Sequence, residues 1–141
     1  EVDLKFMKET YDENIASLHG VQRDISVWKE LLSDEKSVYY IVYEHDSVAW
    51  FRLDYEEEEL WLGMLQVKPA YQRQGIGKFI LLVIEELATK EGFQKIGIHT
   101  TEDNLAGRAI YLSAGYDVTE IGPCTTADGK ERVGYTFEKE I

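Results

Sequence analysis

The fold of this chain is decided by one continuous stretch, Leu60–Lys78, which reads LWLGMLQVKPAYQRQGIGK. Its opening part is almost entirely apolar, which predicts a central strand over Leu60–Val67. Pro69 cannot donate to a strand ladder, so we expect the chain to leave the sheet there. An apolar helical pattern follows and stops at Gly92, which predicts a helix over 75–91.

The turn between this strand and this helix has the chemistry of an anion site. Gly75 and Gly77 let the backbone approach a ligand without a Cβ in the way. Free N–H groups and the helix dipole favour negative charge at a helix start, and Arg73 and Lys78 add full positive charges. The spacing matches neither the dinucleotide fingerprint nor the P-loop. The turn predicts a site suited to a pyrophosphate; the alternative is that the glycines only form the turn.

Charge is distributed unevenly around this stretch. The chain has 141 residues, with 15 Lys and Arg against 27 Asp and Glu, a net charge of -12. Residues 60–84 contain no acid and three bases, a net of +3, whereas residues 1–59 carry -10 and residues 85–141 carry -5. The overall acidity excludes nucleic acid and anionic membrane surfaces as partners, and the local positive segment supports an anion site.

Length and composition predict a single domain over residues 1–141. Apolar residues make up 44%, enough for a sizeable core, so disorder is excluded as the main state. No apolar run approaches the roughly 18 residues of a membrane span. A single cysteine, Cys124, excludes an internal disulfide framework, and no secretory signal pattern is present. We therefore expect a soluble, cytoplasmic protein.

The remaining patterns predict a mixed α/β sheet with helices on both faces. Upstream of the central strand the sequence predicts, in order, a strand over 2–7, a short helix over 11–18, a helix over 24–32 capped by Asp24, a hairpin of 38–43 with 48–55, and an acidic connection over 56–59. Downstream it predicts a strand over 95–101 parallel to 60–67, a helix over 104–114 ended by Gly115, and strands over 116–121 and 132–138 joined by a loop bearing Pro123 and Gly129.

Two motifs resemble those of one family. Val67-x-Pro69 followed by Gln72-Arg73-Gln74-Gly75-Ile76-Gly77 resembles the Q/R-x-x-G-x-G/A signature of the GNAT superfamily of N-acetyltransferases. Asn104-x6-Tyr111-x3-Gly115-Tyr116 resembles the family's Asn…Tyr…Gly-Phe block. The resemblance covers about residues 60–116. It implies the GNAT fold, which is α/β (α+β in some schemes), with a central mixed, mostly antiparallel sheet, a splayed parallel strand pair and flanking helices on both faces.

The resemblance also implies a co-substrate, acetyl-coenzyme A. In the family, the loop and helix start hold the pyrophosphate, which here are Gln72, Arg73, Gln74, Gly75, Ile76, Gly77 and Lys78. Free backbone groups of the preceding strand pair with the pantetheine arm, which here are those of Leu65, Gln66 and Val67. The second motif adds Asn104, Gly107, Arg108 and Tyr111, with the small Gly107 kept for close coenzyme approach. His19, His45 and the lone cysteine have no metal-ligand spacing, so no metal is expected.

The catalytic candidates are Tyr111, His99 and Glu59. The resemblance implies that Tyr111 protonates the leaving thiolate, for which a phenol of ordinary pKa about 10 is a sensible acid; the alternative is a core aromatic. His99 stands where some family members carry a glutamate base, and its alternative role is a strand histidine bonded to backbone. Glu59 is the competing base, acting through water, or a solvated residue of the acidic connection.

The resemblance implies an N-acetyltransferase in which an amine attacks the thioester directly in a ternary complex, with a strand N–H stabilising the oxyanion. The acidic N-terminal part favours a cationic acceptor, either a small amine or a basic peptide. Trp50, Tyr55 and Trp61 offer aromatic faces for such a cation. A homodimer is the family's common habit. The alternative function is a non-catalytic acyl-coenzyme A-binding sensor or interaction module.

Overall fold

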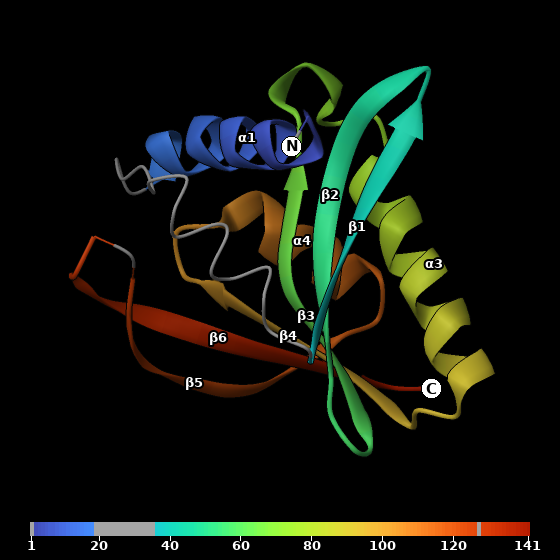
Figure 1. The fold of residues 1–141 in the computed structure, drawn as a ribbon. Helices are drawn as coiled ribbons and strands as arrows, with labels where there is room; N and C mark the ends of the chain where they lie inside the picture. Colours follow the sequence, from blue (N-terminus) through green and yellow to red (C-terminus); the bar gives the residue numbers. More distant parts are fainter. Residues whose placement is uncertain (1, 19–35, 127) are drawn as a thin grey trace.

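The computed structural model describes residues 2–18, 36–126 and 128–141. Within these ranges the elements follow one another in the order α1 (Val2–Leu18), β1 (Ser37–Glu44), β2 (Asp46–Tyr55), β3 (Glu59–Val67), the 3-10 turn η1 (Pro69–Tyr71), α3 (Ile76–Glu91), β4 (Lys95–Thr101), α4 (Leu105–Ser113), β5 (Asp117–Thr125) and β6 (Glu131–Glu140) (Figure 1). None of the described helices is long and apolar enough to cross a membrane.

The six strands form one mixed sheet in the order β1-β2-β3-β4-β6-β5. β3 and β4 pair in parallel, and the four other neighbouring pairs are antiparallel. The almost entirely apolar β3 lies inside the sheet, between β2 and β4, as its sequence predicts. The predicted mixed, mostly antiparallel α/β sheet is confirmed.

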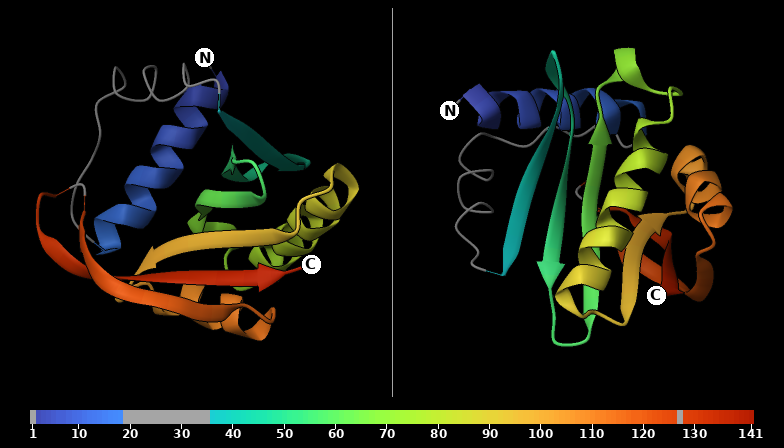
Figure 2. Two further views of the ribbon diagram at one scale, coloured as in Figure 1. Left: turned by 90° about the horizontal axis from the view of Figure 1, so that it is seen from below. Right: turned by 90° about the vertical axis from the view of Figure 1, so that its right-hand side faces the viewer.

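The parallel pair separates halfway along its length. β3 and β4 pair from Glu59 opposite Lys95 to Leu62 opposite Ile98, and no further. Beyond that point residues 64–67 of β3 pair with β2 alone and residues 99–101 of β4 pair with β6 alone. Gly63 is an extra residue in the ladder between β2 and β3, and such a bulge bends its strand. The predicted splay is confirmed, and it opens a V-shaped gap in the sheet (Figure 2).

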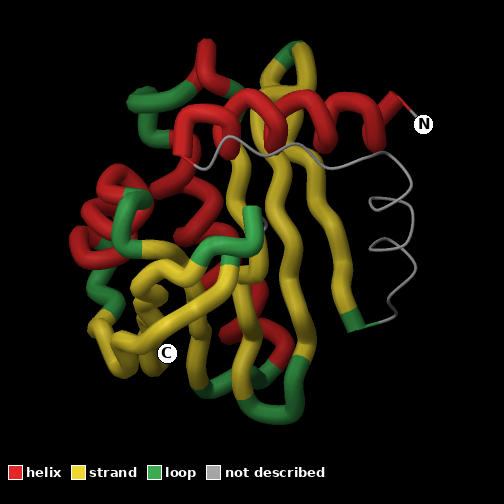
Figure 3. Tube along the Cα trace, turned by 90° about the vertical axis from the view of Figure 1, so that its left-hand side faces the viewer, coloured by secondary structure: helices red, strands yellow, loops and turns green. Residues whose placement is uncertain are grey.

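Helices cover both faces of the sheet. Phe51 and Leu53 of β2 are buried with Ile80 and Ile84 of α3, and Tyr111 of α4 belongs to the same cluster. Trp50, the residue before Phe51, points the opposite way and packs on Met7 and Tyr11 of α1. Figure 3 shows α1 crossing in front of the strands. We call these two sides the α3 face and the α1 face; the prediction of helices on both faces is confirmed.

Two expectations about single elements change. Residues 2–7 are helical, not a strand, and continue into the predicted helix over 11–18, because Met7 and Tyr11 lie one turn apart and pack together against Trp50. Pro123 lies within β5 rather than in a loop; β5 is an edge strand, where the missing N–H removes no ladder bond. The helix over 24–32 and its Asp24 cap lie outside the described residues.

Candidate functional site

The start of α3 is open and uncapped. Its N-cap residue, Gly75, has φ 82°, no side chain caps the helix, and its first turn carries no acid. The first backbone bond runs from the Phe79 N–H to the Gly75 carbonyl at 2.9 Å, so the earlier N–H groups of the turn have no intrahelical partner. A Cβ added at Gly75 would meet nothing within 4 Å, so the turn has open space above it. Arg73 and Lys78 are exposed beside this turn, as an anion site requires.

The loop before α3 is held by side-chain amides. Gln72 donates from Nε2 to the Val67 carbonyl at 3.0 Å and to the Asn14 amide oxygen at 2.9 Å. Asn14, on α1, donates to the same carbonyl at 3.0 Å and to the Gln66 side-chain oxygen at 2.9 Å. Gln74 donates to the Ala70 carbonyl within the loop. The predicted binding residues Gln66, Gln72 and Gln74 therefore shape the loop with their side chains, and Val67 O, predicted for the pantetheine, already has two donors.

Sequence reasoning missed Asn14. It lies more than fifty residues before Val67 and belongs to no motif, and only the packing of α1 on the end of β3 brings the two together.

The backbone of β3 faces the gap at Leu65. The Lys68 N–H donates to the Val48 carbonyl on β2 at 2.9 Å, so Lys68 and Val48 form a hydrogen-bonded pair. Along an antiparallel ladder, residue pairs that are hydrogen-bonded alternate with pairs that are not. Leu65 and Val67 therefore aim their N–H and C=O groups away from β2 and into the gap. Since the Val67 carbonyl is already taken, Leu65 offers both its groups there, as a pantetheine-pairing strand should.

The second motif builds the start of α4. Asn104 is the N-cap: its side-chain oxygen accepts from the Gly107 N–H at 3.2 Å and its amide donates to the Thr100 hydroxyl at 2.9 Å. A Cβ at Gly107 would lie 2.4 Å from the Asn104 amide nitrogen, so the glycine makes room for this cap. The expected reason, close coenzyme approach, stays a prediction beside this one. Arg108 is also engaged internally, donating to the Glu102 carbonyl at 2.8 Å with its guanidinium 4.2 Å from the Tyr135 ring centre.

Tyr111 is buried beneath α4, and its ring meets Phe137 edge-on at a centroid distance of 5.4 Å. Burial raises the pKa of the Tyr111 phenol to about 12, so the hydroxyl stays protonated at neutral pH. Its ring belongs to the core, as the structural alternative held. Burial keeps the phenol protonated, which the predicted acid role needs, but the raised pKa also makes it a weaker acid.

His99 lies where the splay begins. It is the first residue of β4 beyond the parallel pairing, it is exposed, and it lies on the α1 face. Its Nδ1 is 3.0 Å from the Thr136 hydroxyl on β6, and its ring stacks on Trp61 with centroids 4.6 Å apart and planes 9° apart. The histidine therefore bonds to a side chain rather than to backbone, and its Nε2 lies on the far side of the ring from Thr136.

Glu59 lies at the closed end of the gap. It pairs with Lys95, four residues before His99 on β4, which at about 3.3 Å per residue is about 13 Å along the strand. Burial, a hydrogen bond to Glu138 and the negative charge of Glu138 raise the pKa of Glu59 to about 7. Hydrogen bonds from Glu59 and Thr119 and the charge of Lys95 lower the pKa of Glu138. The two carboxyl groups thus hold one proton between them, away from the splay.

This carboxyl pair makes stability depend on pH. Folded Glu59 keeps its proton to about pH 7, whereas the unfolded side chain loses it near 4.5. Between these values the folded state binds more protons, so its stability falls as pH rises through that window. We expect Glu59→Gln, which cannot ionise, to unfold with about 1 kcal/mol more free energy than the wild type near pH 8 and with no gain near pH 5.

Thermal unfolding at the two pH values measures this difference. The control is Glu58→Gln, a change at an exposed neighbour, for which we expect no pH-dependent gain. An equal gain for both variants at both pH values would contradict the shared proton.

The three aromatic side chains expected to face a cation lie in three different environments in the structure. Trp50 is fully buried under α1, so it offers no face to an acceptor. Tyr55 packs on the α3 face, where its hydroxyl bonds to that of Tyr40 and its ring contacts Phe93. Trp61 alone of the three lies partly exposed on the α1 face, beside His99.

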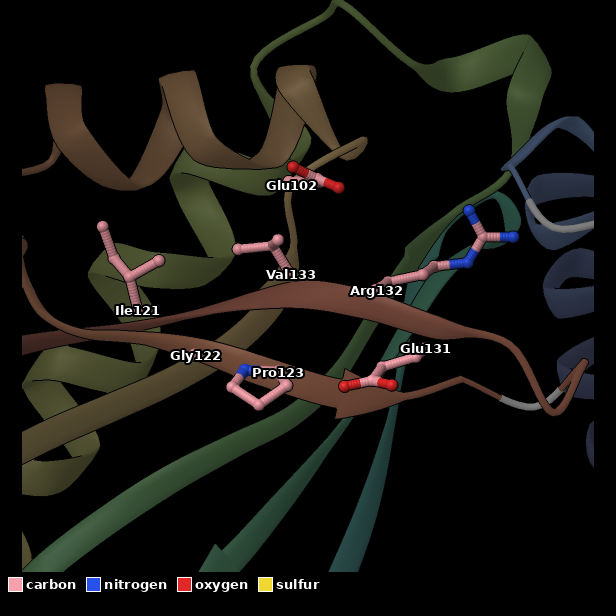
Figure 4. A pocket seen from close by; sticks show the side chains of 7 residues that line it. All are labelled: Glu102, Ile121, Gly122, Pro123, Glu131, Arg132 and Val133. Atoms are coloured by element: carbon pink, nitrogen blue, oxygen red, sulfur yellow. The ribbon is translucent and has the colours of Figure 1, made fainter.

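A shallow pocket of about 560 Å³ lies on the β5–β6 hairpin (Figure 4). Its walls come from both strands and from Glu102 at the end of β4. None of the site residues predicted from the sequence lines it.

Comparison with known proteins points to one family. The model of a family described as "Acetyltransferase (GNAT) family" matches residues 5–116. The chain is 25% identical over 110 residues to "Probable N-acetyltransferase 14" of Xenopus tropicalis, a match covering 76% of this chain and 50% of that protein. The chain spans half or less of the length of the curated relatives it matches.

Solved structures share the fold. The ribosomal-protein-S18-alanine N-acetyltransferase of Escherichia coli superposes with a TM-score of 0.79 at 21% identity, over 99% of this chain and 88% of that one. The PaiA N-acetyltransferase of Thermoplasma acidophilum, in complex with coenzyme A, gives a TM-score of 0.72 at 20% identity, over 99% and 93%. At these identities the likeness shows the fold.

Proposed function

The chain belongs to the GNAT acetyltransferase family, and on that premise we propose that it transfers an acetyl group from acetyl-coenzyme A to a primary amine of a cationic acceptor. The observation that carries the proposal is the splay between β3 and β4, with the uncapped, basic start of α3 beside β3 and His99 at its vertex. The acceptor class and the roles below rest on this arrangement.

The residues at the gap fit acetyl-coenzyme A. The start of α3 offers free N–H groups, the glycine at its N-cap leaves open space, and Arg73 and Lys78 supply positive charge for a pyrophosphate. Leu65 offers unpaired backbone groups for an amide-bearing arm. When bound, the coenzyme supplies a thioester whose carbonyl carbon accepts the amine. The Leu65 N–H is then the strand donor available to stabilise negative charge on the carbonyl oxygen.

His99 is the general base in this proposal. An ammonium has no lone pair, so the acceptor must lose a proton before it can attack, and a histidine suits that step near neutral pH. His99 lies at the opening of the gap with Nε2 directed away from Thr136, whereas Glu59 lies about 13 Å away along the strand and shares its proton with Glu138. These positions favour His99 over the alternative that the sequence left open.

The acceptor approaches, in this proposal, across the α1 face. Trp61 supplies an exposed aromatic face there, which attracts a cation. Glu138 adds negative charge on the same side of the sheet. A small polyamine or a basic peptide meets these requirements.

Two measurements test the proposed function. Calorimetry with acetyl-coenzyme A tests the donor site, and coenzyme A release with a panel of polyamines, amino acids and basic peptides tests transfer. Binding with turnover on a cationic amine supports the proposal. Binding with no turnover on any amine would favour the non-catalytic module. The absence of binding would rule out both the acetyltransferase and the module.

Tyr111→Phe tests the proposed acid. We expect kcat to fall about 100-fold, because the thiolate then leaves without a proton donor, while the ring keeps its contact with Phe137 and the Kd for acetyl-coenzyme A stays unchanged. Stopped assays of coenzyme A release measure kcat, and calorimetry measures the Kd for acetyl-coenzyme A. Tyr135→Phe, at a neighbouring aromatic outside the proposed chemistry, is the control and should retain kcat. Equal rates for Tyr111→Phe and wild type would show that Tyr111 is a core residue only.

A further inference from the structure

We infer that Thr136, Trp61 and Gly97 are positioning residues that hold the His99 ring in one tautomer and one plane, with Nε2 presented to the acceptor amine. The inference deepens the proposed function and rests on it. The three residues lie on three neighbouring strands, and only the folded sheet brings them next to His99.

Thr136 sets the tautomer. It lies directly opposite His99 in the β4–β6 ladder, its side chain is buried, and its hydroxyl is 3.0 Å from Nδ1. The bond survives proton uptake only if Nδ1–H is the donor and Oγ1 the acceptor, because the imidazolium carries a proton on both nitrogens. With Nδ1–H donating, the neutral ring keeps its lone pair on Nε2. In this inference the bond runs from Nδ1–H to the Thr136 Oγ1, which gives the tautomer that a base needs.

Trp61 sets the ring plane. Its indole stacks on the imidazole with the two planes only 9° apart, on a part of the surface where His99 is otherwise exposed. An aromatic face beside the ring also stabilises the imidazolium that forms when the amine gives up its proton. The stack therefore restrains His99 before proton transfer and favours the charged state after it.

Gly97 makes the stack possible. A Cβ at this position would lie 2.3 Å from Cζ3 of Trp61 and within 2.6 Å of two more ring carbons. The indole thus lies flat against the backbone of β4, in space that any other residue would fill. The glycine is required by a side chain on the next strand, since its own φ does not call for one.

Several charged side chains of the elements on this face pair with one another rather than with His99. These pairs are Lys8 with Asp12 on α1, Arg52 with Asp54 on β2, Glu59 of β3 with Glu138 of β6, Lys95 of β4 with Glu138, and Arg132 of β6 with Asp103 and Asp128. Thr136 and Trp61 are therefore the contacts through which the described part of the chain acts on the imidazole.

The test compares Thr136→Val with Thr136→Ser in the full chain. Valine keeps the volume and removes the hydroxyl, whereas serine keeps it. Nitrogen-detected NMR of the imidazole in the free protein reads the tautomer without any turnover. We expect wild type and Thr136→Ser to show the Nδ1–H form, and Thr136→Val to shift toward Nε2–H.

Kinetics supply the second readout. We expect Thr136→Val to lower kcat about 10-fold and to move the acidic limb of the kcat profile to lower pH, because the imidazolium loses a hydrogen-bond acceptor. KM for the acceptor and the Kd for acetyl-coenzyme A should stay unchanged. Trp61→Leu should lower kcat with the tautomer retained and should also raise KM for the acceptor, because it removes the aromatic face proposed for the cation. Trp61→Phe, which keeps an aromatic ring, should recover most of the rate.

The outcomes separate this inference from the proposed function. If the wild type transfers no acetyl group but NMR shows the Nδ1–H form lost in Thr136→Val, the proposed function fails and the positioning stands. An Nε2–H form in the wild type would overturn the inference whatever the activity. Equal loss of rate in the valine and serine variants would also overturn it, since the loss would then come from packing.

Discussion

His99→Gln is expected to lower kcat for acetyl transfer at neutral pH at least about 100-fold, because no other described group at the vertex of the splay is placed to take the amine proton. Glutamine keeps the size of the side chain and its hydrogen bonding to Thr136 but cannot act as a base. Binding of acetyl-coenzyme A should be unchanged, since His99 lies on the α1 face, away from the start of α3. Coenzyme A release across a pH series measures the effect.

The pH series separates a base from a structural residue. The deficit should shrink at high pH, where more of the acceptor amine is already neutral and needs no base. His45→Asn, in the exposed β1–β2 turn, is the matched control and should keep the wild-type profile; asparagine tolerates the positive φ of that turn. If His99→Gln keeps its rate and Glu59→Gln loses it, the proton leaves through water to Glu59 and the proposal is wrong.

Arg73→Glu combined with Lys78→Glu is expected to weaken binding of acetyl-coenzyme A at least about 100-fold. Each hydrogen bond to a charged group contributes roughly 1.5–3 kcal/mol, and the reversed charges add repulsion between the protein and the phosphates. Both side chains are exposed beside an uncapped helix start, so the fold should tolerate the change. Calorimetry with acetyl-coenzyme A at low and high salt measures it.

The control for this double variant is Lys90→Glu combined with Lys130→Glu. It makes the same change in net charge at two exposed positions, the last turn of α3 and the β5–β6 connection. Because exposed charges beyond roughly 10 Å are screened at about 0.1 M salt, the control should bind almost as the wild type does. Equal weakening in both double variants would show that net charge, not the start of α3, governs binding.

Much of the donor site could be predicted from the sequence because its determinants are local. Gly75, Gly77 and the bases around them lie within one turn of a helix start, and the apolar strand before it runs directly into that turn. The acceptor side could not be predicted in this way. His99 acquires its chemistry from Thr136 and Trp61, thirty-seven and thirty-eight residues away in either direction.

The aromatic residues illustrate the same limit. The sequence does not distinguish Trp50 from Trp61 as a surface residue, since each lies in a predicted strand near charged residues. The fold buries Trp50 under α1 and leaves Trp61 beside His99. Burial depends on what covers a face, and the covering helix lies far away in the chain.

The stretch Leu60–Lys78 by itself determined the strand, the turn and the helix, because apolar pattern, proline and glycine act over a few residues. The tertiary structure alone decided which face each side chain meets. Gly63 adds one residue to the β2–β3 ladder, so Leu62 and Leu65 share the α3 face although strict alternation would separate them. Gly63 itself lies against the guanidinium of Arg52, which occupies the space where a Cβ of residue 63 would lie. That bulge is set by pairing across strands, and no local spacing in the sequence records it.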